Sequence, residues 1–264
     1  MAEQRTVDLR TVDLRTVDLR SDDVPSADVP SGDVRSGDVR FVDPDGIRLA
    51  YQVAGPPQAP PLVLLHALGE RASDWDEVLP ALTDRHRVHA LDLRGHGRTG
   101  PAPHYSLDLM RADVLGFLDA LGLDRVDLVG HSMGGVVAYL LAAHQPRRIA
   151  RLVLEDVPLP RPREPVPPVR PAGELDFDWD MVLAVRRQID TPDPSWLDRL
   201  ALITADTLVV AGGPTSHVPQ QGVAELAARI PGARLVTIPA GHLVHRARPA
   251  AFTAELTAFL HASG

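Results

Sequence analysis

The sequence predicts an α/β fold: a mostly parallel sheet with helices on both faces and a short cap insertion. Short apolar runs at residues 62–66, 88–92, 126–130, 152–156, 207–211 and 235–238 have the length and composition of buried strands. Between them lie longer segments whose apolar residues recur at helical spacing. Strands that alternate with helices form a parallel sheet, because each crossover helix covers one face.

The composition is that of one globular domain. Of the 264 residues, 44% are hydrophobic, enough for a substantial core. The formal net charge of -8 argues against nucleic acid and against a membrane surface as partners. The absence of cysteine excludes a disulfide and a thiolate nucleophile. We found no signal peptide and no apolar run of about 20 residues, so we expect a cytoplasmic protein. The sequence carries no indication of its oligomeric state.

Residues 1–40 differ in pattern from the rest. TVDLR occurs three times from Thr6 and is followed by SDDVP, SADVP, SGDVR and SGDVR. This period superficially resembles the pentapeptide-repeat family, but the repeats are too few to stack into a β-helix with a core. Large apolar residues are scarce and Asp recurs throughout, so we predict a disordered tail over residues 1–40 and a folded domain over residues 41–264.

The elements of the domain follow in order from Phe41. FVDPDGIRLAYQVAG carries a Pro-Asp-Gly turn between two apolar runs and predicts a hairpin. Helical spacing covers residues 75–82, 110–121 and 252–260. Residues 157–205 break the alternation, because VPLPRPREPVPPVRP is too rich in proline for a helix or a central strand. Two short helices, around 179–188 and 195–202, complete what we interpret as a small cap at the sheet edge.

GHSMGG, residues 130–135, matches the nucleophile elbow G-x-S-x-G. It follows the strand VDLVG and precedes the helical run VVAYLLAAH, which is the context that the motif requires. Small residues flank Ser132 because the chain must bend sharply there, and the N-terminus of a helix favours negative charge nearby. The alternative is a glycine-rich turn in which Ser132 only caps the helix.

A serine nucleophile needs a base. Among eleven histidines, His242 stands out because it lies in a short loop after the last predicted strand and before the last helix. His245 is its competitor, with exposure or helix-end packing as the other explanation. His66, His96 and His131 adjoin other motif loops, and we expect them to be structural.

Four loops in this order and spacing resemble the α/β-hydrolase family: LHALG (65–69), LDLRGHGRT (91–99), GHSMGG (130–135) and AGH (240–242). The resemblance covers residues 41–264. It implies that Ser132 is the nucleophile and His242 the general base. It also implies that the backbone N–H groups of Leu68 and Met133 form the oxyanion hole. The family more often has His-Gly where this chain has His66-Ala67.

The acid of the catalytic triad is not at its usual place. In the family it most often lies in the loop after the strand at 207–211, where this chain has Thr215. Some members take it from the end of the preceding strand, which here is RLVLED. Alternation sends Glu155 and Asp156 to opposite faces, so only one of them can reach His242. We expect Asp156 to be the acid, with Glu155 second. Three alternatives remain open: Asp156 only binds backbone N–H groups at the start of its loop, the site is a dyad without an acid, or the acid comes from the cap insertion. The candidates in the cap insertion are Asp176, Asp178 and Asp180.

The remaining polar and aromatic residues support smaller expectations. Asp92 and Arg94 look like a pair that braces their loop. Trp75, Trp179 and Leu68 are candidates for lining a substrate pocket, although each could belong to the core. No phosphate-binding or metal-binding motif is present, so we expect no cofactor and no metal.

The expected activity is hydrolysis of an ester-type bond in a small or medium substrate, which is the only partner we expect. A carboxylic ester, a thioester and a lactone are all compatible with the motifs. Two alternatives remain: cleavage of a carbon–carbon bond next to a ketone, and a non-catalytic receptor for a small ligand on the same fold. Thr215 in place of an acid favours the receptor.

Overall fold

The structure, a computed structural model, describes residues 38–262. These residues belong to one compact unit. The repeats before residue 38 lie outside the described residues, so the disordered tail stays a prediction. The first strand, β1 (Asp38–Val42), begins before Phe41, so residues 38–40 belong to the sheet and not to the tail.

One sheet of eight strands organises residues 38–262, in the order β1-β2-β4-β3-β5-β6-β7-β8. The pairs β1–β2 and β2–β4 are antiparallel and the other pairs are parallel. The predicted hairpin and all six predicted strands are confirmed, with small shifts in their ends. The remaining strands are β2 (Leu49–Ala54), β3 (Pro61–Leu65), β4 (Arg87–Leu91), β5 (Val126–His131), β6 (Ile149–Glu155), β7 (Asp206–Ala211) and β8 (Arg234–Thr237).

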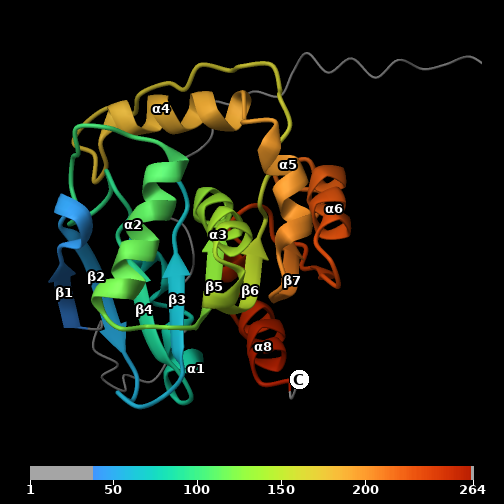
Figure 1. Cartoon of the computed structure of the whole chain (residues 1–264). Helices are drawn as coiled ribbons and strands as arrows, with labels where there is room; N and C mark the ends of the chain where they lie inside the picture. Colours follow the sequence, from blue (N-terminus) through green and yellow to red (C-terminus); the bar gives the residue numbers. More distant parts are fainter. Residues whose placement is uncertain (1–37, 263–264) are drawn as a thin grey trace, which may run out of the picture. The chain divides into compact units, whose positions relative to one another are not determined.

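Helices cover both faces of this sheet, as the alternation predicted (Figure 1). One helix differs from the prediction: residues 75–82 form a 3-10 turn, η2 (Ala72–Trp75), and a separate short helix, because Pro80 can begin a helix but not continue one. The helices are α1 (Leu79–Thr83), α2 (Leu107–Ala120), α3 (Met133–His144), α4 (Trp179–Asp190), α5 (Ser195–Arg199), α6 (Gln220–Arg229), α7 (Val244–Ala247) and α8 (Pro249–Leu260), and the other 3-10 turns are η1 (Pro44–Gly46), η3 (Pro146–Arg148) and η4 (Leu200–Leu202).

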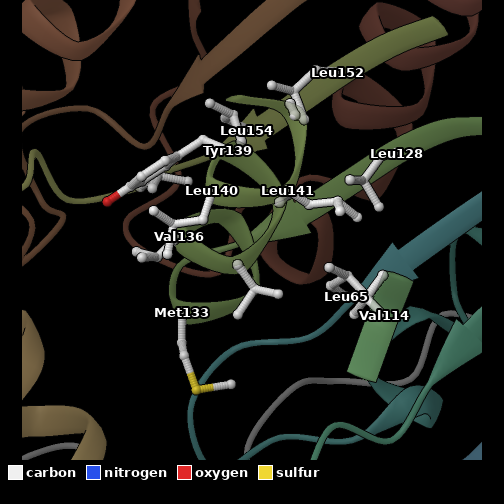
Figure 2. Close-up of a cluster of buried hydrophobic side chains, with 14 of the residues drawn as sticks. Leu65, Val114, Leu128, Met133, Val136, Tyr139, Leu140, Leu141, Leu152 and Leu154 are labelled. Carbon is white, nitrogen blue, oxygen red and sulfur yellow. The ribbon is translucent and has the colours of Figure 1, made fainter. Parts of the chain in front are cut away.

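The core has two layers because successive side chains of each strand point to opposite faces. In β3, Val63 and Leu65 join the layer under α2 and α3, whereas Leu62 and Leu64 join the layer under α1 and α8. Figure 2 shows the centre of the first layer, where apolar side chains of α3 meet those of β5 and β6. Every residue of α3 from its start to Ala143 is buried, so this helix is fixed firmly against the sheet.

The cap segment between β6 and β7 carries α4, which crosses the edge toward which the arrows of β3, β5 and β6 point (Figure 1). Main-chain contacts attach its start to the loop after β4: Gly97 N donates to Asp176 O at 2.7 Å, and Asp178 N donates to Gly95 O at 2.8 Å. Within the described part of the chain, no helix combines the length and the apolar character needed to cross a membrane.

We expect Gly134→Ala to destabilise the fold. A Cβ at this position would overlap the carbonyl oxygens of Leu65 and His66, which belong to the rigid backbone at the end of β3. The free energy of unfolding should fall by about 2 kcal/mol or more, as overpacking of a core does, in urea denaturation. Gly222→Ala in α6 is the control, because its Cβ would have ordinary contact with Leu159 and alanine favours a helix. Equal losses in the two variants would contradict the close approach of α3 to β3.

Candidate active site

Ser132 occupies a strained turn between β5 and α3. Its φ of 50° and ψ of -114° lie in a region that residues with a side chain rarely adopt. Gly130 and Gly134 flank the turn, and a Cβ on Gly130 would lie 2.5 Å from the carbonyl oxygen of Gly134. Met133 is the first residue of α3, so its N–H has no acceptor within the helix. The turn therefore presents the serine beside a free backbone donor.

Asp156 directly follows β6 and contacts His242. Its Oδ2 lies 2.8 Å from Nδ1 of His242, and its side chain is fully buried. The preceding Glu155 points to the other side of the strand and binds His245 instead. Strand alternation thus separates the two carboxylates, as the sequence predicted, and only Asp156 reaches His242.

Four donors converge on the carboxylate of Asp156. Gly212 N and Gln220 Nε2 each donate to Oδ1 at 2.9 Å, and the Ser216 hydroxyl donates to Oδ2, which also faces His242. Burial raises the pKa of Asp156, but the hydrogen bonds from His242, Ser216, Gln220 and Gly212 outweigh it and hold this pKa below its usual value. The carboxylate is therefore charged at neutral pH.

The loop after β7 supplies hydrogen-bond donors instead of an acid. Ser216 in this loop and Gln220 at the start of α6 both reach Asp156, while no hydrogen bond joins Thr215 to His242 among the described residues. Sequence reasoning missed Ser216 and Gln220. The sequence offered no signal for them, because Ser216 lies in the loop before α6 and Gln220 is only the first residue of that helix.

The ring of His242 lies against two other imidazoles. Ring centroids are 4.1 Å apart for His217 and 4.7 Å apart for His131. Partial burial and the neighbouring His242 lower the pKa of His217 to about 4, so that ring is neutral. Nδ1 of His242 faces Asp156, which leaves Nε2 for the serine. Within residues 38–262 no hydrogen bond joins Ser132 to this ring, so proton transfer requires a closer approach than the ligand-free geometry has.

His66 and His96 brace the loop that carries Leu68. Leu93 N donates to His66 Nε2 at 3.0 Å, and Gly69 N donates to His96 Nε2 at 3.1 Å. Both rings accept a hydrogen bond, and burial lowers the pKa of both histidines, so both are neutral. Their role is structural, as the sequence predicted. They hold the candidate oxyanion loop against the loop after β4.

The predicted pair of Asp92 and Arg94 is wrong. Asp92 does brace its loop, but it accepts hydrogen bonds from the backbone of Ala72 at 2.7 Å and of Arg98 at 2.9 Å. Arg94 instead forms a bidentate ion pair with Asp113: its Nε donates to Oδ2 at 2.7 Å and its Nη2 donates to Oδ1 at 2.6 Å. The chain turns between these residues, with His96 N donating to Leu93 O at 2.9 Å, and the two side chains have separate partners.

The expectation that Trp75 lines a substrate pocket is wrong. Its side chain is fully buried in the layer under α8, where its ring stacks on His245 with centroids 4.4 Å apart. Trp179 begins α4 and is half-buried against the other layer, so its pocket role stays a prediction. Phe177 was missed: its ring lies next to Gly69, in the loop that carries Leu68, and it reaches this place from the cap.

His245 is not available as a base. It is buried between Glu155, 2.9 Å from Nδ1, and Asp74, 3.1 Å from Nε2. Burial alone would lower the pKa of His245, but the two carboxylates outweigh it and raise this pKa to about 10. Without a metal ion, this ring is an imidazolium at neutral pH, and it cannot accept a proton from a serine.

Comparison with known proteins decides the family. A family model for the alpha/beta hydrolase fold matches residues 60–186. A hydrolase from Pseudomonas aeruginosa PA01 is 31% identical, with a TM-score of 0.69, over 86% of this chain and 100% of that one. The chain belongs to the α/β hydrolase fold family. The predicted resemblance and the predicted fold are therefore confirmed.

Other α/β hydrolase relatives have diverse names. An enol-lactonase from Burkholderia xenovorans LB400 is 26% identical, with a TM-score of 0.67, over 84% of this chain and 100% of that one. Mouse "Epoxide hydrolase 4" is 38% identical over 118 residues, which are 44% of this chain and 33% of that protein. The chain thus matches only a third of the length of this curated relative.

The neutral histidines of the oxyanion loop predict a pH effect on stability. In the unfolded chain His96 takes up a proton below about pH 6.5. In the folded chain burial lowers the pKa of His96, so the ring stays neutral there. The contribution of the neutral His96 to folding stability is therefore present above about pH 6.5 and is lost as the pH falls. The stability difference between the parent and His96→Gln should therefore narrow by up to about 1.4 kcal/mol per pH unit below pH 6.5. Urea denaturation between pH 8 and pH 5 measures it. His144→Gln, at an exposed position, is the control, and a constant difference for His96→Gln would contradict a neutral buried ring.

Proposed function

We propose that the protein is a serine hydrolase that cleaves an ester-type bond, in a carboxylic ester, a thioester or a lactone, through an acyl-enzyme. The observation that carries the proposal is the 2.8 Å contact between His242 Nδ1 and the buried Asp156, next to a serine in a strained elbow. A serine, an imidazole and a charged carboxylate at one sheet edge are the parts of a triad.

In the proposed first step, the Ser132 oxygen attacks the carbonyl carbon of the substrate while its proton passes to Nε2 of His242. The negative charge that develops on the carbonyl oxygen is held by the N–H groups of Leu68 and Met133. Each such donor contributes about 3–4 kcal/mol in a comparable site. The imidazolium then gives its proton to the leaving group. A water molecule, deprotonated by the same ring, releases the acid and restores the serine.

Asp156 serves this step in two ways. Its hydrogen bond fixes the His242 tautomer that carries the proton on Nδ1 and leaves Nε2 free to accept. Its charge stabilises the imidazolium that forms. His217, packed on the same ring, is neutral and adds no positive charge that would oppose the imidazolium.

The choice of an ester-type bond follows from the nucleophile. The family resemblance implies that epoxide opening uses a carboxylate nucleophile, and this chain has Ser132 at the elbow, so the match to mouse "Epoxide hydrolase 4" supports the fold but not that chemistry. The enol-lactonase likeness favours an ester-type bond. The receptor alternative depended on a missing acid, and Asp156 removes that support. Carbon–carbon cleavage stays a second candidate, because it uses the same three groups.

We expect a fluorophosphonate probe to label the protein and Ser132→Ala to abolish the labelling. The probe reacts only with a serine whose proton is removed by a nearby base. Gel fluorescence and mass spectrometry of the labelled peptide measure it. Ser73→Ala, with a half-buried serine outside the candidate site, is the control and should label like the parent. Absence of labelling in the folded parent would favour the receptor.

A substitution series tests the acid on a panel of short- and medium-chain esters and lactones. Asp156→Asn should lower kcat by about 10⁴, because the amide leaves His242 in the wrong tautomer. Thr215→Ala should keep the parent rate. Glu155→Gln should act mainly on the free energy of unfolding, since Glu155 binds His245 and not His242. Full turnover by Asp156→Asn, with loss in Glu155→Gln or Thr215→Ala, would refute the assignment.

A further inference from the structure

We propose that Asp74, His131 and His245 form a binding site for a divalent metal ion, with zinc as the best match. Each residue offers one ligand atom, and these atoms all lie within 4.8 Å of one another. The candidate ligand atoms are Asp74 Oδ2, His131 Nδ1 and His245 Nε2, because each is buried without a hydrogen-bond partner among the described residues. The three residues come from separate segments: η2, the end of β5 and α7. The site adjoins the candidate active site, because His131 directly precedes Ser132 and His245 follows His242 by three residues.

These three atoms are buried and have no hydrogen-bond partner among the described residues. His131 and His245 are fully buried, and the Asp74 side chain is 1% exposed. A buried polar atom without a partner costs about 1–3 kcal/mol, and native structures hold few of them. Asp74 Oδ2 and His245 Nε2 are held together as an ion pair at 3.1 Å, so His131 Nδ1 is the atom that an ion bound by all three residues would satisfy.

In each histidine, the ring nitrogen that is not a candidate ligand has a partner of its own. These nitrogens are Nε2 of His131 and Nδ1 of His245. His131 Nε2 donates to the carbonyl oxygen of His242 at 2.9 Å, so its Nδ1 carries a lone pair. Nδ1 of His245 lies 2.9 Å from both oxygens of Glu155, which also accepts the backbone N–H of His245. A carbonyl or carboxylate behind a ligating imidazole is the usual outer arrangement of a metal site.

The competing occupant is a single proton on Nε2 of His245. This proton would serve the ion pair of His245 Nε2 with Asp74 Oδ2, whose atoms are 3.1 Å apart, but it would leave Nδ1 of His131 unpaired. A metal ion bonds to all three atoms at once and releases that proton to solvent. Two neutral imidazoles with the carboxylates of Asp74 and Glu155 carry a charge of about -2, which a divalent ion balances.

The donor set suits zinc, which binds imidazole nitrogen and carboxylate oxygen at about 2.0–2.2 Å. Tetrahedral ligands then lie about 3.4 Å apart. His245 and Asp74 already meet this spacing at 3.1 Å, and His131 lies near enough for a small side-chain adjustment. Arg246 and Glu70 flank the outer side: Arg246 Nη1 lies 3.3 Å from Asp74 Oδ1, and both side chains are partly exposed. An ion can enter there, although the Arg246 charge opposes it.

The experiment uses the full chain with any affinity tag removed, cleared of metal with a chelator at pH 8. We expect one equivalent of Co²⁺ to give the visible absorption of a tetrahedral site, and Zn²⁺ to displace it. The thermal midpoint should rise by about 5–10 °C at a hundredfold excess of Zn²⁺ over its Kd. Asp74→Asn should weaken binding at least 100-fold, and His245→Gln should abolish the Co²⁺ spectrum. His144→Gln is the matched control, an exposed histidine that should leave binding unchanged.

Two results would overturn the site. One is stoichiometric binding that survives Asp74→Asn, a conservative change that keeps the chain folded even if His245→Gln does not. The other is ¹⁵N NMR showing protons on both nitrogens of His245 in the intact chain at saturating Zn²⁺, which means that the occupant is a proton only. Neither readout uses a substrate, so failure of this site and failure of the proposed hydrolysis are separate results.

Discussion

The carboxylate of Asp156 is the group on which the arrangement of the candidate site depends. It receives hydrogen bonds from Gly212, Ser216 and Gln220 and contacts His242, so it joins the end of β6 to the loops after β7 and β8. A buried charge is tolerated only when donors of this kind surround it. The loops that carry these donors are therefore ordered by the same charge that orients the imidazole. Neutralising this one group would loosen two loops as well as remove the charge beside His242.

Backbone strain is concentrated at the same place. Ser132 and Asp156 are the two residues other than glycine with positive φ in the described part of the chain, at 50° and 46°. Such conformations cost of order 1–3 kcal/mol each and persist where the surroundings over-determine them. Ser132 is fixed by the close approach of α3 to β3, and Asp156 by its four donors together with its own N–H, which donates to Val210 O at 2.8 Å. The two strained turns end neighbouring parallel strands, which is why both residues lie at the same edge of the sheet.

The sequence predicted the fold and the central residues of the site because those depend on local patterns. The elbow around Ser132 is a contiguous motif, and the strands are contiguous apolar runs. The prediction of Asp156 depended on strand alternation and on the resemblance to family members whose acid lies at the end of this strand. Ser216 and Gln220 could not be found this way, because neutral polar residues in a loop have no pattern that names their distant partner. Trp75 was misassigned for a related reason: a large aromatic side chain suits a core and a pocket equally, and only packing decides between them.

The adjacent carboxylates of Glu155 and Asp156 bind different histidines because their side chains point to opposite sides of the strand. Glu155 meets His245 and Asp156 meets His242, which gives two histidine–carboxylate pairs with His131 between them. Its ring centroid lies 4.7 Å from that of His242 and 5.2 Å from that of His245. Burial holds the pKa of His131 well below its ordinary value, so it stays neutral. A positive charge on this ring would repel an imidazolium at His242, so its neutrality favours the charge that the proposed mechanism places there. The residue before the serine therefore contributes to the electrostatics beside His242 as well as to the end of β5.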